Sequence, residues 1–235
     1  MPKGTLFLIP VPLAENSAEK VLTNFHSNII NNVSAYIVEN EKTARFWLKN
    51  MGLKIPQSQL LIHVYGKHSD KVDIRSYFPE LENGQDVGLM SEAGCPAVAD
   101  PGSDIVAEAH RRGIKVAPMV GPSSIILALM ASGFNGQNFT FHGYLPIDKI
   151  QRSKRIKELE HIAERHNQTQ IFIETPFRNN QVLEEILKSC DAKTRLCLAC
   201  NITGADEQII SQPVEQWRRQ KHDFHKKPTI FLIAK

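Results

Sequence analysis

Apolar residues along this chain recur in two patterns, short continuous runs and helically spaced positions. The runs have the length of buried strands, and the first five lie at 5–9, 35–38, 60–64, 87–90 and 115–118. Helical spacing marks the intervening segments 17–30, with Ser17 as its cap, then 41–51, 69–77 and 103–112. Pro79 predicts a break after the third of these segments. Strands that alternate with such helices indicate a mostly parallel sheet covered on both faces.

The pattern pauses around Pro118–Pro122 and then starts again. A nearly all-apolar helix is expected from Ser124 to Ala131, and its composition requires burial on most sides. Strands follow at 139–142, 169–174, 195–200, 208–211 and 229–234, with helices near 149–166 and 179–190. The short gap between 195–200 and 208–211 predicts antiparallel pairing there. We therefore expect two α/β domains, residues 1–118 and 119–235, a size that 235 residues comfortably allow.

Composition excludes several classes of protein. The hydrophobic fraction of 42% and the charged fraction of 23% are ordinary for a globular chain. No apolar run reaches the roughly 18–20 residues that cross a bilayer, and no signal peptide precedes the first strand, so we expect a cytoplasmic protein without a membrane segment. Four cysteines are too few and too scattered for a disulfide framework. Cys197 and Cys200 would point to opposite faces of a strand, so no metal site is expected.

The net charge of +3 says little about partners, but basic residues crowd two stretches. One lies within 149–157 (Lys149, Arg152, Lys154, Arg155, Lys157) and the other within 218–227. Such clusters neutralise nucleic-acid phosphates, although each is equally typical of a solvated helix face or loop.

The loop that follows the strand 87–90 is the main candidate for chemistry. Ligands of open α/β sheets bind beyond the carboxyl ends of the strands. Residues 91–102 form a twelve-residue connection there, whereas most such connections need about two to six residues. Ala93 and Gly94 permit close approach of a ligand, Pro96 and Pro101 stiffen the path, and Ser103 is a possible helix cap. Glycine-rich dinucleotide or phosphate-binding motifs and hydrolase motifs do not occur in the sequence.

Several strings resemble motifs of the tetrapyrrole (corrin/porphyrin) methylase superfamily. M-S-E-A-G-C-P-A-V-A-D-P-G (90–102) resembles V-S-D-A-G-T-P-x-I-x-D-P-G, and P-M-V-G-P-S-S (118–124) resembles P-x-P-G-P-S/C-A. H-G-Y-L-P (142–146) is similar to G-F-L-P, and I-E-T-P-F-R (173–178) to Y-E-S-P-H-R. The match runs in order from about residue 4 to the C-terminus, and within the superfamily the chain most resembles the ribosomal RNA methyltransferases.

The resemblance implies two α/β domains that bind S-adenosyl-L-methionine in a cleft between them, in a homodimer. It also implies transfer of the methyl group to the ribose 2′-oxygen of a cytidine in small-subunit rRNA. The implied cofactor contacts come from the loops after the strands (Pro10, Val11, Pro12, Glu92, Ala93, Gly94, Ser123, Ser124, Tyr144, Leu145, Ile202, Pro228 and Thr229). Ser123 and Ser124 are equally expected as plain helix caps, and Tyr144 and Leu145 as core residues.

Two pairs of charged residues are candidates for catalysis. Glu39 matches a retained glutamate of the family and Lys42 stands where the family has arginine, while Glu174 and Arg178 match the E and R of Y-E-S-P-H-R. A base that accepts the ribose proton, or a cation that lowers the pKa of the hydroxyl, suits the reaction. Each pair could equally be a structural ion pair, and Glu92 is expected to organise the loop or contact the cofactor.

The chain departs from the family pattern at charged positions. The motif A-R-E-x-T-K-x-x-E appears as residues 199–207 with Cys200 and Asn201 in place of arginine and glutamate, and K-G-E appears as Lys227-Pro228-Thr229. Two alternatives therefore stay open. One is a methyltransferase acting on another RNA or a small molecule, and the other is a non-catalytic paralogue that binds S-adenosylmethionine or RNA.

Overall fold

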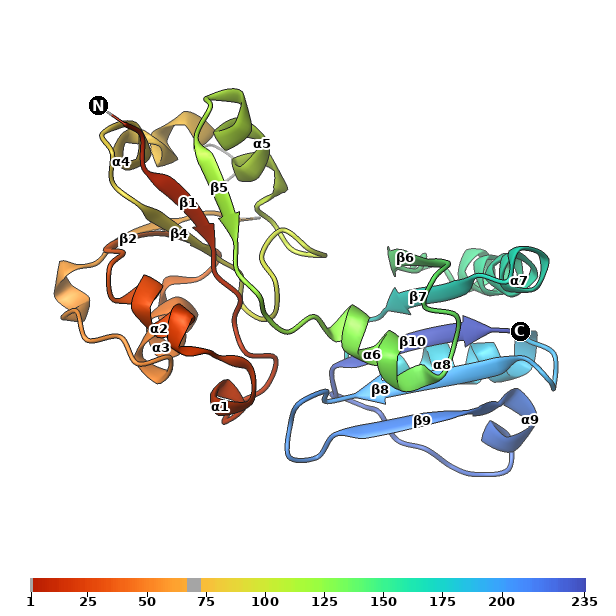
Figure 1. Cartoon of the computed structure of the whole chain (residues 1–235). Coiled ribbons are helices and arrows are strands. Elements are labelled where there is room, and N and C mark those ends of the chain that lie inside the picture. The colour runs from red at the N-terminus through yellow and green to blue at the C-terminus, as the bar shows by residue number, and fades with distance from the viewer. Residues whose placement is uncertain (1, 67–72) are drawn as a thin grey trace. The chain divides into compact units, whose positions relative to one another are not determined.

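The computed structural model describes residues 2–66 and 73–235, which form two compact units (Figure 1). The first unit spans Met1–Ser123 and the second Ser124–Lys235. Each contains a five-stranded sheet and is described by itself.

The first unit is built on a fully parallel sheet. Its strands are β1 (Thr5–Leu8), β2 (Ala35–Val38), β3 (Leu61–Val64), β4 (Val87–Met90) and β5 (Lys115–Pro118), in the order β3-β2-β4-β1-β5. All four pairings are parallel, as the alternation of strands and helices predicted. Every residue of β2 and β4 is buried, because helices cover both faces of a parallel sheet.

Helices lie on both faces of this sheet. They are α1 (Ala18–Val21), α2 (Asn24–Ile30), α3 (Glu41–Asn50), α4 (Pro79–Glu82) and α5 (Ser103–Arg111), with 3-10 turns η1 (Gln57–Gln59) and η2 (Ile74–Tyr77). One apolar cluster joins α2 and α3 to one face of β1, β2 and β4, and a second joins η2, α4 and α5 to the other face. Figure 1 shows the two groups on opposite sides of the sheet.

Two local expectations in this unit are wrong, and one is confirmed. The helix predicted over 17–30 is broken, because Leu22 is extended and Thr23 starts α2 with a capping box to His26. The break expected at Pro79 is present, because η2 ends at Tyr77 and Pro79 then opens the separate helix α4, where proline is tolerated in the first turn. Gly102, at φ +120°, holds the N-cap position of α5 that Ser103 was expected to fill. Part of the helix predicted over 69–77 lies outside the described residues, and its end, η2, is a 3-10 turn.

The second unit has a mixed sheet. Its strands are β6 (Phe139–Tyr144), β7 (Thr169–Ile173), β8 (Arg195–Cys200), β9 (Gln208–Pro213) and β10 (Thr229–Ala234), in the order β6-β7-β10-β8-β9. β6 and β7 are parallel, and the other pairs are antiparallel, including the predicted pairing of β8 with β9. β10, near the end of the chain, therefore occupies the centre of the sheet.

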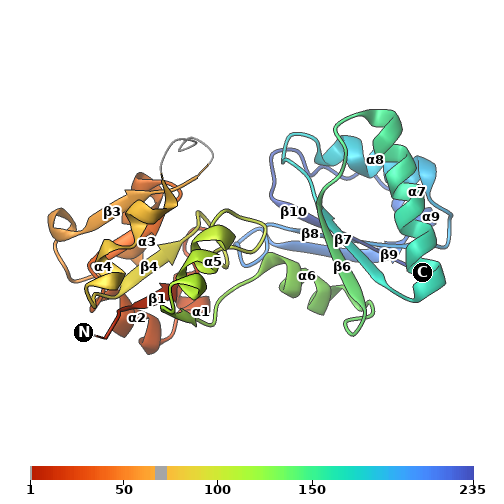
Figure 2. The same ribbon diagram turned by 90° about the horizontal axis from the view of Figure 1, so that it is seen from above.

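Four helices cover this sheet: α6 (Ser124–Ser132), α7 (Lys149–His166), α8 (Asn179–Ser189) and α9 (Val214–Trp217). α6 packs against β8, β9 and β10, while α7 packs against β7, β10 and α8. Figure 2 shows α6 on one face and α7, α8 and α9 on the other. The sequence did not predict α9, because a four-residue helix is too short to show a helical period.

Candidate functional site

Three loops meet at the carboxyl edge of the first sheet. The loop after β1 is joined to the loop after β4 by two backbone hydrogen bonds, in which the amide of Val11 donates to the carbonyl of Gly94 (2.9 Å) and the amide of Gly94 donates to that of Val11 (2.8 Å). Gly94 has φ +74° and is buried. The positive φ that glycine permits thus brings the two loops into contact. The two residues before it, Glu92 and Ala93, are exposed.

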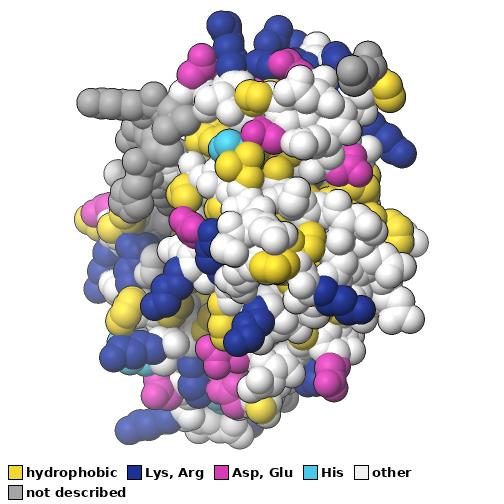
Figure 3. Space-filling view, turned by 90° about the vertical axis from the view of Figure 1, so that its left-hand side faces the viewer, with side chains coloured by type: hydrophobic (Ala, Val, Ile, Leu, Met, Phe, Trp, Pro, Cys, Tyr) yellow, Lys and Arg dark blue, Asp and Glu magenta, His cyan; other side chains and the backbone are white. Residues whose placement is uncertain are grey.

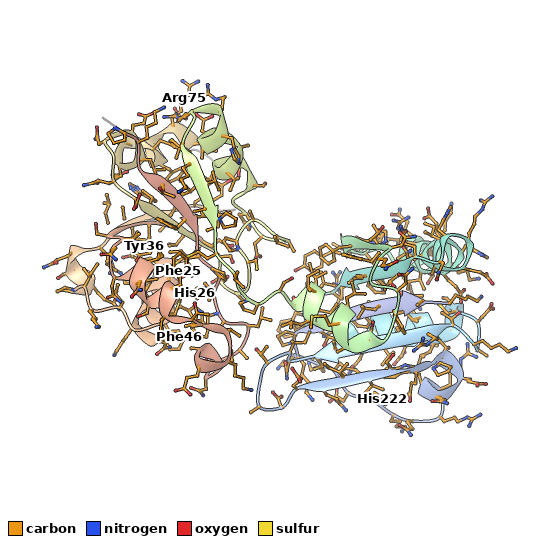
Figure 4. The ribbon with its side chains drawn as sticks, in the orientation of Figure 1. Phe25, His26, Tyr36, Phe46, Arg75 and His222 are labelled. Atoms are coloured by element: carbon orange, nitrogen blue, oxygen red, sulfur yellow. The ribbon has the colours of Figure 1, made fainter. Side chains whose placement is uncertain are left out.

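The third loop, 119–122, packs against the other two. A Cβ atom on Gly121 would lie 2.1 Å from Cβ of Pro10, so only glycine allows this approach. The thiol of Cys95 donates to the carbonyl of Pro122 (3.3 Å). His26 of α2, labelled in Figure 4, contacts the carbonyl of Val120 through Nε2 at 2.7 Å. The sequence offered no signal for His26, because its partner lies 94 residues away.

The predicted charged residues of this unit lie at the same edge. Glu39 directly follows β2, and Asn40 caps α3 by accepting a hydrogen bond from the amide of Thr43 (3.1 Å). The hydroxyl of Thr43 also donates to the carboxylate of Glu92 (3.3 Å). Glu92 therefore links the loop after β4 to the first turn of α3, which carries the exposed Lys42.

The 91–102 loop is held in a costly backbone conformation. Ala97 (φ +65°) and Ala99 (φ +62°) lie in the left-handed region, which costs a residue with a Cβ atom about 1 kcal/mol each. Burial raises the pKa of Asp100, a hydrogen bond from Ser91 opposes this shift, and the charge of Glu92 adds to it. Backbone strain and ionisable groups with shifted pKa values occur at functional sites more often than elsewhere.

Asp100→Asn should therefore stabilise the protein at neutral pH. The folded chain binds the Asp100 proton more tightly than the unfolded chain, whose pKa is the ordinary 3.8, so this group stabilises the fold fully below pH 3.8. That contribution is lost as the pH rises through the folded-state pKa. Melting temperatures measured between pH 3 and pH 7 should show the variant gaining on the wild type as the pH rises. A constant difference across this range would contradict the assignment.

In the second unit, the remaining candidates gather at one edge of the sheet. Tyr144 and Ile173 pair at the ends of β6 and β7, and Thr229 at the start of β10 pairs with Cys200 at the end of β8. The edge thus carries the predicted residues of four segments (Tyr144, Leu145, Glu174, Arg178, Ile202, Pro228, Thr229). Tyr144 is 58% exposed, whereas Leu145 belongs to the core, so the structure separates two residues that the sequence left equivalent.

Glu174 and Arg178 form an ion pair at this edge. Oε1 of Glu174 accepts from Arg178 Nη2 (2.5 Å) and Nε (3.0 Å) and from the Thr175 amide (2.6 Å). The carboxylate is buried, and within the part of the chain that the structure describes its Oε2 has no hydrogen-bond partner. One oxygen is therefore saturated and orients Arg178, while the other can still accept a donor.

Arg152 is not part of the basic surface that the sequence suggested. Only 1% of its side chain is exposed, and it makes a two-bond pair with Glu185 (2.7 Å each). It also donates to the carbonyls of Pro146 (3.2 Å) and Ile147 (2.7 Å). This buried pair thus fixes the segment that follows Tyr144 and Leu145. On the face drawn in Figure 3, Lys and Arg side chains are interspersed with acidic and apolar ones.

A cavity of about 120 Å³ lies at the opposite edge of the second sheet, lined by Gly133, Phe134, Asn135, Thr169, Arg195 and Lys235 among others. Cys197 and Cys200 are buried, free thiols. Over residues 2–66 and 73–235, no cluster of three His, Cys, Asp or Glu side chains could hold a metal ion. Over the same residues, none of the helices combines the length and apolar character needed to cross a bilayer.

Comparison with known proteins decides the family. A family model described as Tetrapyrrole (Corrin/Porphyrin) Methylases matches residues 32–217. The chain belongs to this family. It is an S-adenosylmethionine-dependent methyltransferase, as its resemblance to the family implied.

Relatives of this chain match almost its whole length. The protein named ribosomal RNA small subunit methyltransferase I of Pasteurella multocida is 28% identical over 98% of this chain and 79% of its own length. That of Pseudomonas aeruginosa is 26% identical over 100% of this chain and 80% of its own length. The crystal structure of the methyltransferase CobJ covers 100% of this chain and 94% of its own, with a TM-score of 0.62 and 17% identity. CobJ therefore shares the fold.

Proposed function

We propose that this methyltransferase transfers the methyl group of S-adenosylmethionine to a ribose 2′-oxygen of a cytidine in small-subunit rRNA. The observation that carries the proposal is the match, over 98–100% of the chain, to proteins named ribosomal RNA small subunit methyltransferase I. We further propose that the enzyme is a cytoplasmic homodimer, with domains divided near residue 118.

The residues at both edges fit the cofactor. In the first unit, the small side chain of the exposed Ala93 leaves room for a ligand, and the neighbouring Glu92 offers a carboxylate for ribose hydroxyls. In the second unit, Tyr144 presents an exposed ring, and Glu174 Oε2 is a buried acceptor. The bound cofactor supplies an activated methyl group, so the protein has mainly to orient the acceptor and exclude water. We propose that the other predicted residues also contact the cofactor (Pro10, Val11, Pro12, Gly94, Ser123, Ser124, Leu145, Ile202, Pro228, Thr229).

The two charged pairs receive different roles in this proposal. Glu174 acts as a positioning residue, because its bonded oxygen holds the guanidinium of Arg178. Arg178, whose side chain is 25% exposed, then lowers the pKa of the ribose hydroxyl. Glu39 is the candidate that accepts the ribose proton, and the exposed Lys42 stabilises the negative charge that develops on the ribose oxygen during methyl transfer.

Ala93→Leu should block the cofactor. The larger side chain would occupy the exposed face of the loop, and we expect a loss of affinity for S-adenosylmethionine of about 100-fold or more by calorimetry. Ala131→Leu, at an exposed position on the last turn of α6, is the control and should bind as the wild type does. If Ala93→Leu bound S-adenosylmethionine with unchanged affinity, the cofactor would have to bind away from this loop.

The substrate is tested by mass spectrometry of small-subunit rRNA from cells that lack this protein. We expect one ribose-methylated cytidine to lose its methyl group, and complementation with the wild type, but not with Ala93→Leu, to restore it. An unchanged methylation pattern would exclude this substrate. It would then favour another acceptor or a binding role, in line with the substituted positions Cys200 and Asn201.

A further inference from the structure

The exposed ring of Phe177 lies beside the side chains of His225 and Lys226 at the same edge of the second sheet. Phe177, between β7 and α8, is 68% exposed. The ring of His225 meets it edge to face, with centroids 5.9 Å apart and an angle of 75° between the planes. Nζ of Lys226 lies 5.9 Å from the centroid of the Phe177 ring, within the range of a cation–π contact.

The segment that carries His225 and Lys226 is fixed by α8. Asn179 donates through Nδ2 to the carbonyls of Lys227 (2.6 Å) and Phe224 (3.2 Å). Asn180 donates to the carboxylate of Asp223 (2.7 Å) and accepts from the amide of Phe224 (2.8 Å).

The same segment is tied directly to the Phe177 loop. The amide of Lys226 donates to the carbonyl of Pro176 (2.9 Å), and Lys226 itself has φ +60°. Phe224 is 1% exposed and lies in the core beside Trp217. The three residues therefore lie on two loops that are hydrogen-bonded to each other, so the backbone that carries them is already ordered before RNA binds.

We propose that Phe177, His225 and Lys226 form a platform on which an unpaired base of the RNA substrate stacks. Single-stranded RNA is recognised largely by stacking on aromatic side chains, with cations placed for the adjoining phosphates. Lys226 supplies such a cation, and the basic segment from Arg218 to Lys227 extends from the same loop. A solvated loop needs no exposed phenylalanine, whereas a stacking surface does.

The platform adjoins the proposed reaction edge. Phe177 precedes Arg178, and Lys226 lies two residues before Pro228. A base stacked there belongs to a nucleotide that flanks the methylated one. This inference rests on the proposed function, which it deepens by naming the residues that hold single-stranded RNA.

The experiment measures binding of a fluorescent single-stranded RNA of about 12 nucleotides that carries one 2-aminopurine. Phe177→Leu keeps an apolar side chain but removes the aromatic face, and should raise Kd roughly 5- to 100-fold. Stacking quenches 2-aminopurine, so the quench should disappear in Phe177→Leu and persist in Phe177→Trp. Lys226→Gln should reduce the slope of log Kd against log salt by about 0.7.

Two controls separate stacking from misfolding and from loss of the cofactor. Phe25→Leu removes a 57% exposed phenylalanine from α2, which Figure 4 labels, and should bind RNA as the wild type does. The affinity for S-adenosylmethionine should be the same in Phe177→Leu and the wild type, because the platform contacts the RNA and not the cofactor.

Each failure has its own signature. If the wild type binds RNA and Phe177→Leu binds equally well with the same quench, the platform is overturned and the proposed function stands. If the wild type binds through Phe177 yet transfers no methyl group to small-subunit rRNA, the proposed function fails and the platform stands. If the wild type binds S-adenosylmethionine but not the single-stranded RNA, the platform is overturned and the exposed ring would instead suit a protein partner, while the methylation pattern of the rRNA still decides the proposed function.

Discussion

Arg152→Met should lower the free energy of unfolding of the second unit by about 3–5 kcal/mol. The substitution leaves the carboxylate of Glu185, which is 4% exposed, without its partner in the core. A buried charge that loses its partner costs this much, because neither water nor a counter-ion replaces the lost bonds. The carbonyls of Pro146 and Ile147 lose a donor as well. Denaturant unfolding followed by the fluorescence of Trp217, which is fully buried in this unit, measures the change.

Two further variants distinguish the buried pair from the helix. Arg165→Met on the same α7 removes an exposed cation and should change stability by no more than about 0.5 kcal/mol. Arg152→Met combined with Glu185→Leu removes both charges and should recover most of the loss. Equal losses of unfolding free energy in Arg152→Met and Arg165→Met would show that the buried ion pair stabilises the unit no more than an exposed cation does.

Gly121→Ala should reduce kcat/KM by about 100-fold. The new Cβ atom would lie 2.1 Å and 2.2 Å from Cβ and Cγ of Pro10, and proline is too rigid to turn aside. The loop after β1 must therefore shift, and with it the hydrogen-bonded pair of Val11 and Gly94. A displacement of about 1 Å at a site that works by positioning costs this much in rate. Methyl transfer to rRNA with a labelled cofactor measures the effect.

Gly136→Ala is the matched control for this experiment. An added Cβ atom at Gly136 meets nothing within 4 Å, so its activity should equal that of the wild type. If Gly121→Ala were as active as this control, the three loops would be free to separate and would not form the cofactor site.

The positions of the strands along the chain, though not their order in the sheets, could be predicted from the sequence. Five short apolar runs separated by helical segments predicted the parallel sheet of the first unit, because burial on both faces leaves no polar alternation. The antiparallel β8–β9 pair followed from its short connection. The break at Leu22 and the start of α4 at Pro79 did not follow, since single-residue backbone choices override a helical period.

The sequence by itself determined the family and the loops that carry it, because the 90–102 motif and its companions are local strings. Tertiary structure alone decided what those loops do. Gly94 binds Val11, Gly121 admits Pro10, and His26 reaches Val120, each across a separation that no local pattern encodes. The same holds for charge. Arg152 was expected among several surface cations but is buried against Glu185, because burial depends on which elements pack together.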